Sequence, residues 1–185
     1  MRVLALNCGS SSLRCAVIDT VSGQRLAERH EELRGQTHAE VLERWTRDWS
    51  RPGCKELEGI EAVGHRVVHG GEAFRDAALV TDASLARIAA LSPLAPLHNP
   101  ANLAGIHALA AAFPDLPQVA VFDTAFHHTL PPHAYLYALP YDLYEAHGIR
   151  RYGFHGISHR SASRAAAKRL GLDGVAHRIL VAHLG

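Results

Sequence analysis

The sequence predicts an α/β fold, because strand-like apolar runs alternate along the chain with segments of helical character. The strand-like runs are rich in Val, Leu, Ile and Ala, and turn residues bound most of them. The helical segments start at Thr, Asn or Ser and stop near Gly or Pro. The chain has 185 residues and 48% of them are hydrophobic, which is enough apolar material for one ordinary core.

Five segments have the composition of strands: 2–8, 12–19, roughly 62–69, 118–122 and 178–185. The first two flank Gly9-Ser10-Ser11, so we expect them to be joined by a tight polar turn. The third runs into Gly70-Gly71. The proline-rich stretch 131–140 is expected to be a surface connection.

Three helices are predicted, each from its cap residues: Thr37 with Glu40, Asn99 with Pro100, and Ser158. The first carries an apolar stripe and ends near Pro52-Gly53. The second has a stripe that includes Leu103 and Ile106. The third is rich in alanine, and Gly171 closes it.

The charge balance excludes partners that require a strong net field. The chain has 19 basic and 18 acidic residues, so we expect no nucleic acid and no anionic membrane as partner. No apolar stretch approaches the roughly 18 residues that a membrane helix requires. The three cysteines, Cys8, Cys15 and Cys54, have no zinc-ligand spacing and are odd in number, which favours reduced thiols and a cytoplasmic location.

The turn Asn7-Cys8-Gly9-Ser10-Ser11-Ser12 is the first candidate for chemistry. A glycine and small hydroxyl residues between two strands can present backbone N–H groups to a phosphate without steric obstruction. Arg14, two positions into the second strand, adds a positive charge. An ordinary glycine-serine hairpin with an outward-facing arginine would have the same sequence.

Arg66 lies in the segment GHRVVHGG at 64–71, which alternates along a strand so that Arg66 and Val68 share one face. An arginine beside an apolar side chain suits a small carboxylate with a short hydrocarbon tail, because Arg binds the carboxylate bidentately. The alternative is a half-buried edge strand with Arg66 in an ion pair.

Two further candidates follow later in the chain. Asp123 stands at the carboxyl end of an apolar strand, where α/β folds place their ligand crevices, although such aspartates often cap a turn. His155 lies between Gly153 and Gly156 just before a predicted helix start, which favours the approach of an anion to backbone amides.

The spacing of His155 and His159, like that of His65 and His69, also raises the possibility of a metal site. The glutamate of an HExxH motif is missing, and no third ligand occurs at a useful spacing. We therefore favour the phosphoryl interpretation of His155.

Taken together, six segments resemble the acetate kinase family, part of the superfamily of acetate and sugar kinases, heat-shock 70 proteins and actin. They occur in family order: LNCGSSSLR at 6–14, VGHRVVHGGE at 63–72, PLHNP at 96–100, VFDTAFH at 121–127, LPYDLYEAHGIRRYGFHGISH at 139–159 and VAHLG at 181–185. The resemblance implies a ribonuclease H-like, actin-like ATPase domain with a mixed sheet flanked by helices.

The resemblance also implies roles, residue by residue. Asn7 would lie near Mg²⁺ and the phosphates. Arg66 would anchor acetate. Asp123 would be the essential acidic residue, and His155 would steady the transferring phosphoryl group. The remaining implied residues are Ser10, Ser12 and Arg14 for the phosphates, Val68 and Leu97 for the acetate pocket, and His183, Leu184 and Gly185 for a phosphate loop that begins HLG. Arg14 departs from the lysine that is usual in the family, which changes a compact ammonium into a planar fork.

The resemblance further implies that residues 1–185 are the N-terminal, acetate-binding domain of a two-domain protein, with the C-terminal domain absent from this sequence. In the complete enzyme, which we expect to be a homodimer, the carboxylate would attack the γ-phosphate of ATP directly and in line, with Mg²⁺, to give acetyl phosphate and ADP. The isolated chain is expected to be inactive. Two alternatives remain open: a propionate or butyrate kinase of the same family, and a non-catalytic ribonuclease H-like binding or dimerisation module.

Overall fold

The computed structural model describes residues 1–172, 174 and 176–184. Its centre is a mixed sheet with the strand order β3-β2-β1-β4-β6-β5. The strands are β1 (Arg2–Cys8), β2 (Ser12–Asp19), β3 (Arg25–Glu32), β4 (Ile60–Val67), β5 (Ala78–Leu79) and β6 (Gln118–Phe122). β1, β2 and β3 form an antiparallel meander, whereas β4 runs parallel to both β1 and β6. The carboxyl ends of β1, β4 and β6 therefore lie at one edge of the sheet.

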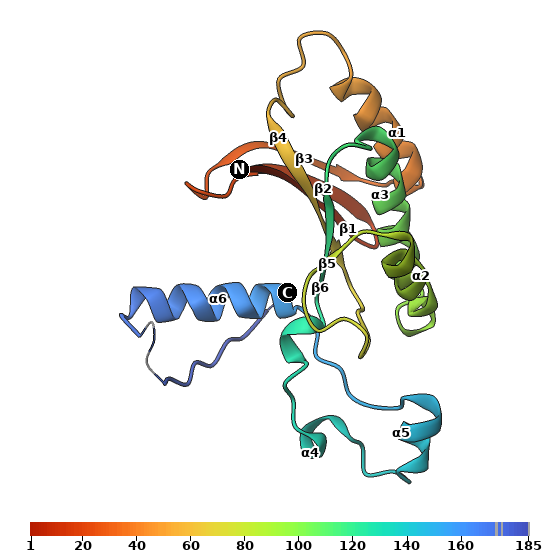
Figure 1. The fold of residues 1–185 in the computed structure, drawn as a ribbon, viewed down its shortest axis with the longest axis vertical. Coiled ribbons are helices and arrows are strands. Elements are labelled where there is room, and N and C mark those ends of the chain that lie inside the picture. The colour runs from red at the N-terminus through yellow and green to blue at the C-terminus, as the bar shows by residue number, and fades with distance from the viewer. Residues whose placement is uncertain (173, 175, 185) are drawn as a thin grey trace.

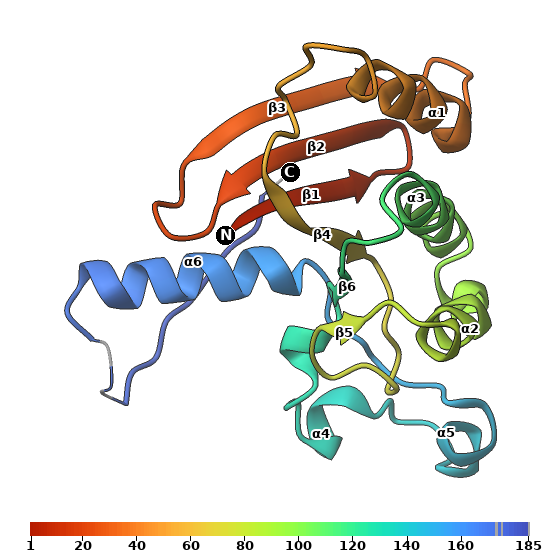
Figure 2. The ribbon, with the colours of Figure 1, turned by 45° about the horizontal axis from the view of Figure 1, so that its top comes forward.

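The long helices lie on both sides of this sheet (Figures 1 and 2). On one side are α1 (His38–Trp49), α2 (Asp82–Ala90) and α3 (Asn99–Ala112). On the other side is α6 (Gly156–Arg169), whose first residue lies beside the carboxyl end of β6. Short elements complete the chain: η1 (Ser92–Leu94), η2 (Ala125–His127), α4 (Pro132–Tyr135) and α5 (Asp142–His147). Among the described residues, none of the helices has the length and apolar character needed to span a bilayer.

The core lies between the sheet and the α1–α3 layer. Alternation along β1 buries Leu4 and Leu6 against this layer, because side chains two apart in a strand share a face. They pack with residues of β2, β4 and α1 such as Leu13, Val63 and Leu42. A second cluster around Val67, Ile106 and Phe122 continues the core toward α2.

Several predicted elements are confirmed and one is wrong. The predicted strands at 2–8, 12–19 and 118–122 have the same bounds in the structure, and α1 has the predicted capping box of Thr37 and Glu40. The predicted strand over 178–185 is not formed: the described residues 176–184 have neither helix nor strand, and Gly185 lies outside the described residues. A strand requires a partner for its backbone N–H and C=O groups, and this apolar segment pairs with no described strand.

Two helix starts also differ from prediction. The N-cap of α3 is His98, and Asn99 is its first helical residue. Helix α6 begins at Gly156 with His155 as N-cap, so Ser158 lies inside the first turn instead of capping the helix. In both cases the residue that a sequence pattern marks as a cap makes tertiary hydrogen bonds, as described below.

Candidate functional site

The candidate site is a cleft where the carboxyl ends of β1, β4 and β6 meet the start of α6. Open α/β sheets bind their ligands at such an edge. The cleft has a volume of about 780 Å³. Six of its lining residues were predicted from the sequence: Asn7, Arg14, Arg66, Asp123, His155 and His183. The fold thus brings residues from both ends of the chain to one place.

Arg66 links two other predicted residues in the cleft. Its Nε and Nη2 donate to Oδ2 of Asp123 at 3.1 and 2.6 Å, and its Nη1 donates to Oδ1 of Asn7 at 3.0 Å. The Asp123 side chain is only 3% exposed, so the guanidinium compensates a buried carboxylate. A guanidinium carries five N–H groups. The bonds to described residues use three of them, which leaves two for a bound anion.

This arrangement shows that the two interpretations of Arg66 do not exclude each other. The ion pair that was the alternative to an anion site is present, but it lies inside the cleft. Asp123 and Asn7 fix the guanidinium plane, while two donors stay available to a ligand. An ion pair and an anion site are therefore compatible in Arg66.

The backbone of Asp123 joins three elements. Its N–H donates to the carbonyl of Val67 in β4 at 3.0 Å, and its carbonyl accepts from the N–H of Gly156 in α6 at 2.8 Å. A Cβ at position 156 would lie 2.2 Å from the Asp123 carbonyl oxygen, so only glycine permits this contact. The carboxylate is consequently held in a fixed position relative to β4 and to the start of α6.

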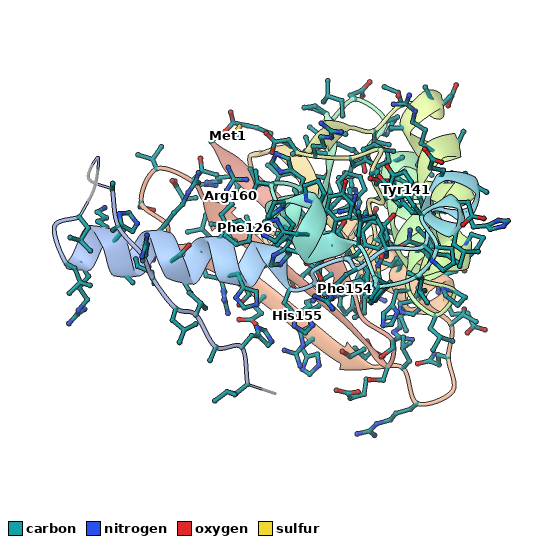
Figure 3. All side chains as sticks on the ribbon, turned by 90° about the horizontal axis from the view of Figure 1, so that it is seen from below. Met1, Phe126, Tyr141, Phe154, His155 and Arg160 are labelled. Carbon is teal, nitrogen blue, oxygen red and sulfur yellow. The ribbon has the colours of Figure 1, made fainter. Side chains whose placement is uncertain are left out.

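His155 lies just before the first turn of α6, next to Phe154 (Figure 3). Its backbone is left-handed, with φ of 54°, which is uncommon for a residue other than glycine. Its ring stacks on that of His183, with centroids 4.3 Å apart, and His183 Nδ1 lies 3.1 Å from the hydroxyl of Ser158. The Gly156 N–H binds the Asp123 carbonyl, so this first amide of α6 is not available to an anion. The predicted approach of an anion to the other amides of the first turn stays a prediction.

The predicted phosphate turn is tightly built but only partly in the cleft. The N–H of Gly9 donates to the carbonyl of Ser12 at 2.8 Å, and the Gly9 carbonyl lies 2.6 Å from Nε2 of His38 in α1. Ser10 is exposed and Ser12 half-buried, and neither lines the cleft. Arg14 does line it, because it is paired with Asn7 across β1 and β2.

The predicted acetate wall does not form part of the cleft in this structure. Val68 is 7% exposed and Leu97 is 77% exposed, and neither lines the cleft. Leu184 is 91% exposed, and Gly185 lies outside the described residues. The roles assigned to these four residues stay predictions.

Sequence reasoning missed one wall of the cleft. One face of α6 supplies it with Ile157, Ser158, Ser161 and Ala162. Their spacing along the helix is the signal that could have identified them, since residues three and four apart share a helical face. Sequence reasoning also missed three buried polar residues behind the cleft, Asn99, Asn102 and Thr124, whose partners are backbone groups distant in sequence.

His65 on β4 and His69, two residues after its end, are buried in the interior and do not line the cleft. His65 is 2% exposed, and its Nε2 lies 2.7 Å from Oε1 of Gln118. Burial lowers the pKa of His65 to about 4 and also lowers that of His69. His69 accepts the N–H of Gly71 at Nδ1. In the part of the chain that the structure describes, no group of three or more His, Cys, Asp or Glu side chains could hold a metal ion.

Curated proteins that are similar to this chain over nearly its whole length are named acetate kinases. The chain is 47% identical to the acetate kinase of Shewanella amazonensis over 99% of its own length and 48% identical to acetate kinase 1 of Vibrio cholerae, also over 99%. It covers 51% of each of those proteins, so it spans about half the length of the curated relatives it matches.

Solved structures of a propionate kinase and an acetate kinase are also similar to this chain. A propionate kinase from Francisella tularensis matches with a TM-score of 0.83 and 41% identity, over 93% of this chain and 50% of that one. The acetate kinase of Porphyromonas gingivalis matches with a TM-score of 0.80 and 42% identity, over 93% and 49%. With the mixed sheet and the cleft at its edge, these matches define a domain of the actin-like ATPase class. Residues 25–185 match the acetokinase family model, and the chain belongs to the acetokinase family.

Proposed function

We propose that these 185 residues are the carboxylate-binding domain of a two-domain kinase that transfers the γ-phosphoryl group of ATP to acetate. The observation that carries this proposal is the arrangement of Arg66, Asp123 and Asn7 in the cleft of an acetokinase-family chain. The similarity to proteins named acetate kinase over nearly the whole chain supports the choice of acetate.

Arg66 is the proposed ligand of the acceptor. Its two remaining N–H groups match the two oxygens of a carboxylate, and the bonds to Asp123 and Asn7 orient the guanidinium before the substrate arrives. A carboxylic acid with a pKa of about 4 to 5 is ionised at neutral pH and needs no base. Asp123 therefore acts by orienting Arg66, not by removing a proton from the acceptor.

The transfer step needs alignment and charge stabilisation. A carboxylate oxygen attacks the γ-phosphorus, the bond from that phosphorus to the bridging oxygen of ADP breaks in line, and acetyl phosphate and ADP leave. His155, which lines the cleft and stacks on His183, is the proposed hydrogen-bond donor to the phosphoryl oxygens, and Arg14 adds positive charge to the same cleft. The turn with Ser10 and Ser12, together with His183, Leu184 and Gly185, is proposed to contact the nucleotide phosphates.

The cleft also offers oxygen atoms of the kind that Mg²⁺ prefers. Asn7 Oδ1 and the Asp123 carboxylate meet on the same guanidinium, so both face one volume of the cleft. We propose that these two residues hold the ion, through water where Arg66 occupies their oxygens. When bound, Mg²⁺ neutralises charge on the phosphate oxygens.

A second candidate substrate is propionate, because a propionate kinase is among the similar solved structures. Val68 and Leu97 are proposed to line the pocket for the hydrocarbon tail, and their contribution decides how long a tail is accepted. Butyrate is the next longer substrate of this kind.

The non-catalytic alternative is a module that only binds or dimerises. It requires that the two-domain protein bind nucleotide without turnover.

We extend the proposal to the whole protein. A homodimer is proposed for the two-domain form, as the family resemblance implies. A cytoplasmic location is proposed because Cys8, Cys15 and Cys54 are free thiols, which suits a reducing compartment.

Substitution of Arg66 tests the function. The experiment uses the two-domain form: the native continuation of the chain where the gene encodes one, and otherwise a fusion to the second half of the Porphyromonas gingivalis acetate kinase. Initial rates are measured with acetate, propionate and butyrate. In Arg66→Ala we expect the carboxylate KM to rise at least about tenfold, because a charge-assisted bidentate contact contributes on the order of 1.5–3 kcal/mol.

The ATP KM of the same variant serves as internal control, and Arg66→Lys shows whether charge alone suffices. We expect Arg66→Lys to recover part of the carboxylate KM only, because an ammonium cannot bind bidentately. An unchanged carboxylate KM in Arg66→Ala would contradict the role of Arg66. Nucleotide binding by the wild type without turnover on any of the three acids would instead support the non-catalytic module.

A further inference from the structure

The two segments that carry the proposed substrate contacts leave the sheet side by side. β1 and β4 are paired in parallel up to Leu6 and His65. Past this point β1 leads into the turn after Cys8, and β4 leads into Val68 and the double glycine. The backbone groups of these continuations need other partners, because buried N–H and C=O groups are costly to leave unpaired.

The side chain of Asn102, from the first turns of α3, joins the two continuations. Its Oδ1 accepts the N–H of Val68 at 3.0 Å, and its Nδ2 donates to the carbonyl of Cys8 at 3.0 Å. The residue is 2% exposed. A carboxamide offers a donor and an acceptor in one plane, like a peptide group. Asn102 therefore connects the two chain segments where direct strand pairing has ended.

A neighbouring asparagine makes a similar pair of bonds to only one of the two segments. Asn99, which is 0% exposed, accepts the N–H of His69 at 3.1 Å and donates to the carbonyl of the same residue at 3.0 Å. It fixes the continuation of β4 but does not touch β1. The hydrogen bonds of Asn102 therefore join the continuation of β1 to that of β4, whereas those of Asn99 stay within the continuation of β4.

We propose that Asn102 is a positioning residue of the carboxylate-kinase reaction, which sets the separation between the phosphate turn and the carboxylate-binding strand. This inference rests on the proposed function. Asn102 does not line the cleft, and it acts through Cys8, which follows Asn7 directly, and Val68, which lies two residues after Arg66. The 3.0 Å bond between Arg66 and Asn7 closes the same connection from the side of the cleft.

The consequence concerns the rate more than the affinity. Each substrate contacts one segment, so a change in their separation leaves each binding contact largely intact. In-line transfer depends on both segments together, and a misplacement of about 1 Å lowers such rates on the order of 100-fold. Loss of the Asn102 bond to Cys8 is therefore expected to lower kcat while both KM values stay nearly constant.

The test compares Asn102→Asp with Asn99→Asp in the two-domain form. Asn102→Asp keeps the volume and the bond to Val68, but it turns an oxygen toward the Cys8 carbonyl in place of an N–H donor. We expect kcat to fall at least about 30-fold in Asn102→Asp, with both KM values changed less than about threefold. In Asn99→Asp the same exchange affects β4 alone, and we expect kcat to stay within about threefold of wild type, with a raised carboxylate KM.

The pH dependence gives a second readout. Position 102 is 2% exposed, and burial raises the pKa of a carboxyl group placed there. Once protonated, it can again donate to the Cys8 carbonyl. The kcat of Asn102→Asp relative to wild type should therefore rise between about pH 8 and about pH 6. A flat ratio, or equal kcat losses in the two variants, would overturn the inference.

A measurement on the unaltered chain covers the case in which a variant does not fold. The Val68 amide and the Asn102 side-chain amide should exchange with D₂O at least about 1,000-fold more slowly than unprotected amides, since both are buried and hydrogen-bonded. Rapid exchange of either amide would overturn the proposed connection through Asn102. A wild type that phosphorylates no carboxylate would overturn the proposed function, whereas an active wild type with an unimpaired Asn102→Asp variant would overturn only the inference about Asn102.

Discussion

His155 combines an exposed side chain with an unusual backbone. Its left-handed conformation directs the ring toward His183, and the Gly156 bond to Asp123 fixes the start of α6 behind it. Such conformations cost of order 1–3 kcal/mol and persist when the surroundings impose them. Here the cost accompanies a side chain that lines the cleft.

Replacement of His155 tests whether the ring acts on the transition state. In His155→Ala, we expect kcat to fall by roughly 100- to 1,000-fold while both KM values change little, because a donor aimed at developing charge contributes mainly at the transition state. The control is His133→Ala, an exposed histidine in α4 outside the cleft. Initial rates of both variants are measured in the two-domain form to obtain kcat and KM. A normal kcat in His155→Ala would show that this residue has only a structural role.

His65 should make the stability depend on pH. The folded chain keeps it neutral down to its lowered pKa of about 4, whereas the unfolded chain protonates it near 6.5. Between these values protons bind preferentially to the unfolded state, so stability is full above about pH 6.5 and falls as the pH drops toward 4. The expected loss is about 3 kcal/mol.

Urea denaturation of the wild type and of His65→Phe, from pH 7.5 to 4.5, measures this effect. The wild type should lose more stability than His65→Phe over the interval, because only the former has the titrating ring. His69, whose pKa is also lowered, contributes equally to both proteins and cancels in the comparison. Parallel pH profiles of the two proteins would contradict the assignment to His65.

At the scale of residues, the sequence predicted those site positions that combine a reactive type with a strand end. Arg66, Asp123 and Asn7 are of this kind. Asn102 could not be found, because its partners Cys8 and Val68 are backbone groups that only the fold brings together. Leu97 was assigned by resemblance alone, and its high exposure leaves its role untested.

Helix α3 approaches β1 so closely that it requires a glycine. A Cβ on Gly105 would lie 2.5 Å from Sγ of Cys8 and 3.1 Å from Cδ2 of Leu6. Alanine is favoured over glycine in a helix by roughly 0.5–1 kcal/mol, but overpacking a tight core costs about 1–3 kcal/mol. We expect the second effect to win, so that Gly105→Ala lowers the free energy of unfolding.

A double-mutant cycle tests whether the contact with Cys8 causes the loss of stability in Gly105→Ala. Cys8→Ala removes the sulfur that the new methyl group would meet, so the double variant should recover part of the stability lost in Gly105→Ala beyond simple additivity. Denaturant unfolding of the four proteins gives the coupling free energy. A coupling indistinguishable from zero would mean that the Cys8 contact does not cause the loss.

At the scale of elements, the sequence predicted the bounds of an element where neighbouring residues form the hydrogen bonds that define its end. The capping box of α1 is such a case. Strand β3 was not predicted, because two of its three inward positions are charged. Arg29 pairs with Asp48 and Glu56, and Glu31 binds Arg44 and the indole N–H of Trp45. These ion pairs with α1 and the loop after it replace the apolar alternation that identifies a strand.

For the whole molecule, the proposal predicts that the 185-residue chain alone is inactive. In-line transfer gains much of its rate from aligning both substrates and excluding water, which in the proposal requires the second domain. We expect no measurable acetyl phosphate from ATP, Mg²⁺ and acetate in a hydroxamate assay, beside a two-domain protein as positive control. Turnover within a factor of about 100 of that control, abolished by Asp123→Ala, would contradict this, since such a loss is less than ~3 kcal/mol of barrier.

The strand order has a consequence for the way in which the molecule folds. The meander β1-β2-β3 forms from neighbours in sequence, whereas the cleft joins Arg66 to Asn7 and to Asp123, which are 59 and 57 residues away. Contacts of long sequence separation form late, because the entropy of closing the loop opposes them until other contacts help. We therefore expect the meander with α1 to act as an early nucleus and the cleft to be assembled last, so that substitutions at Arg66 or Asp123 accelerate unfolding more than they slow folding.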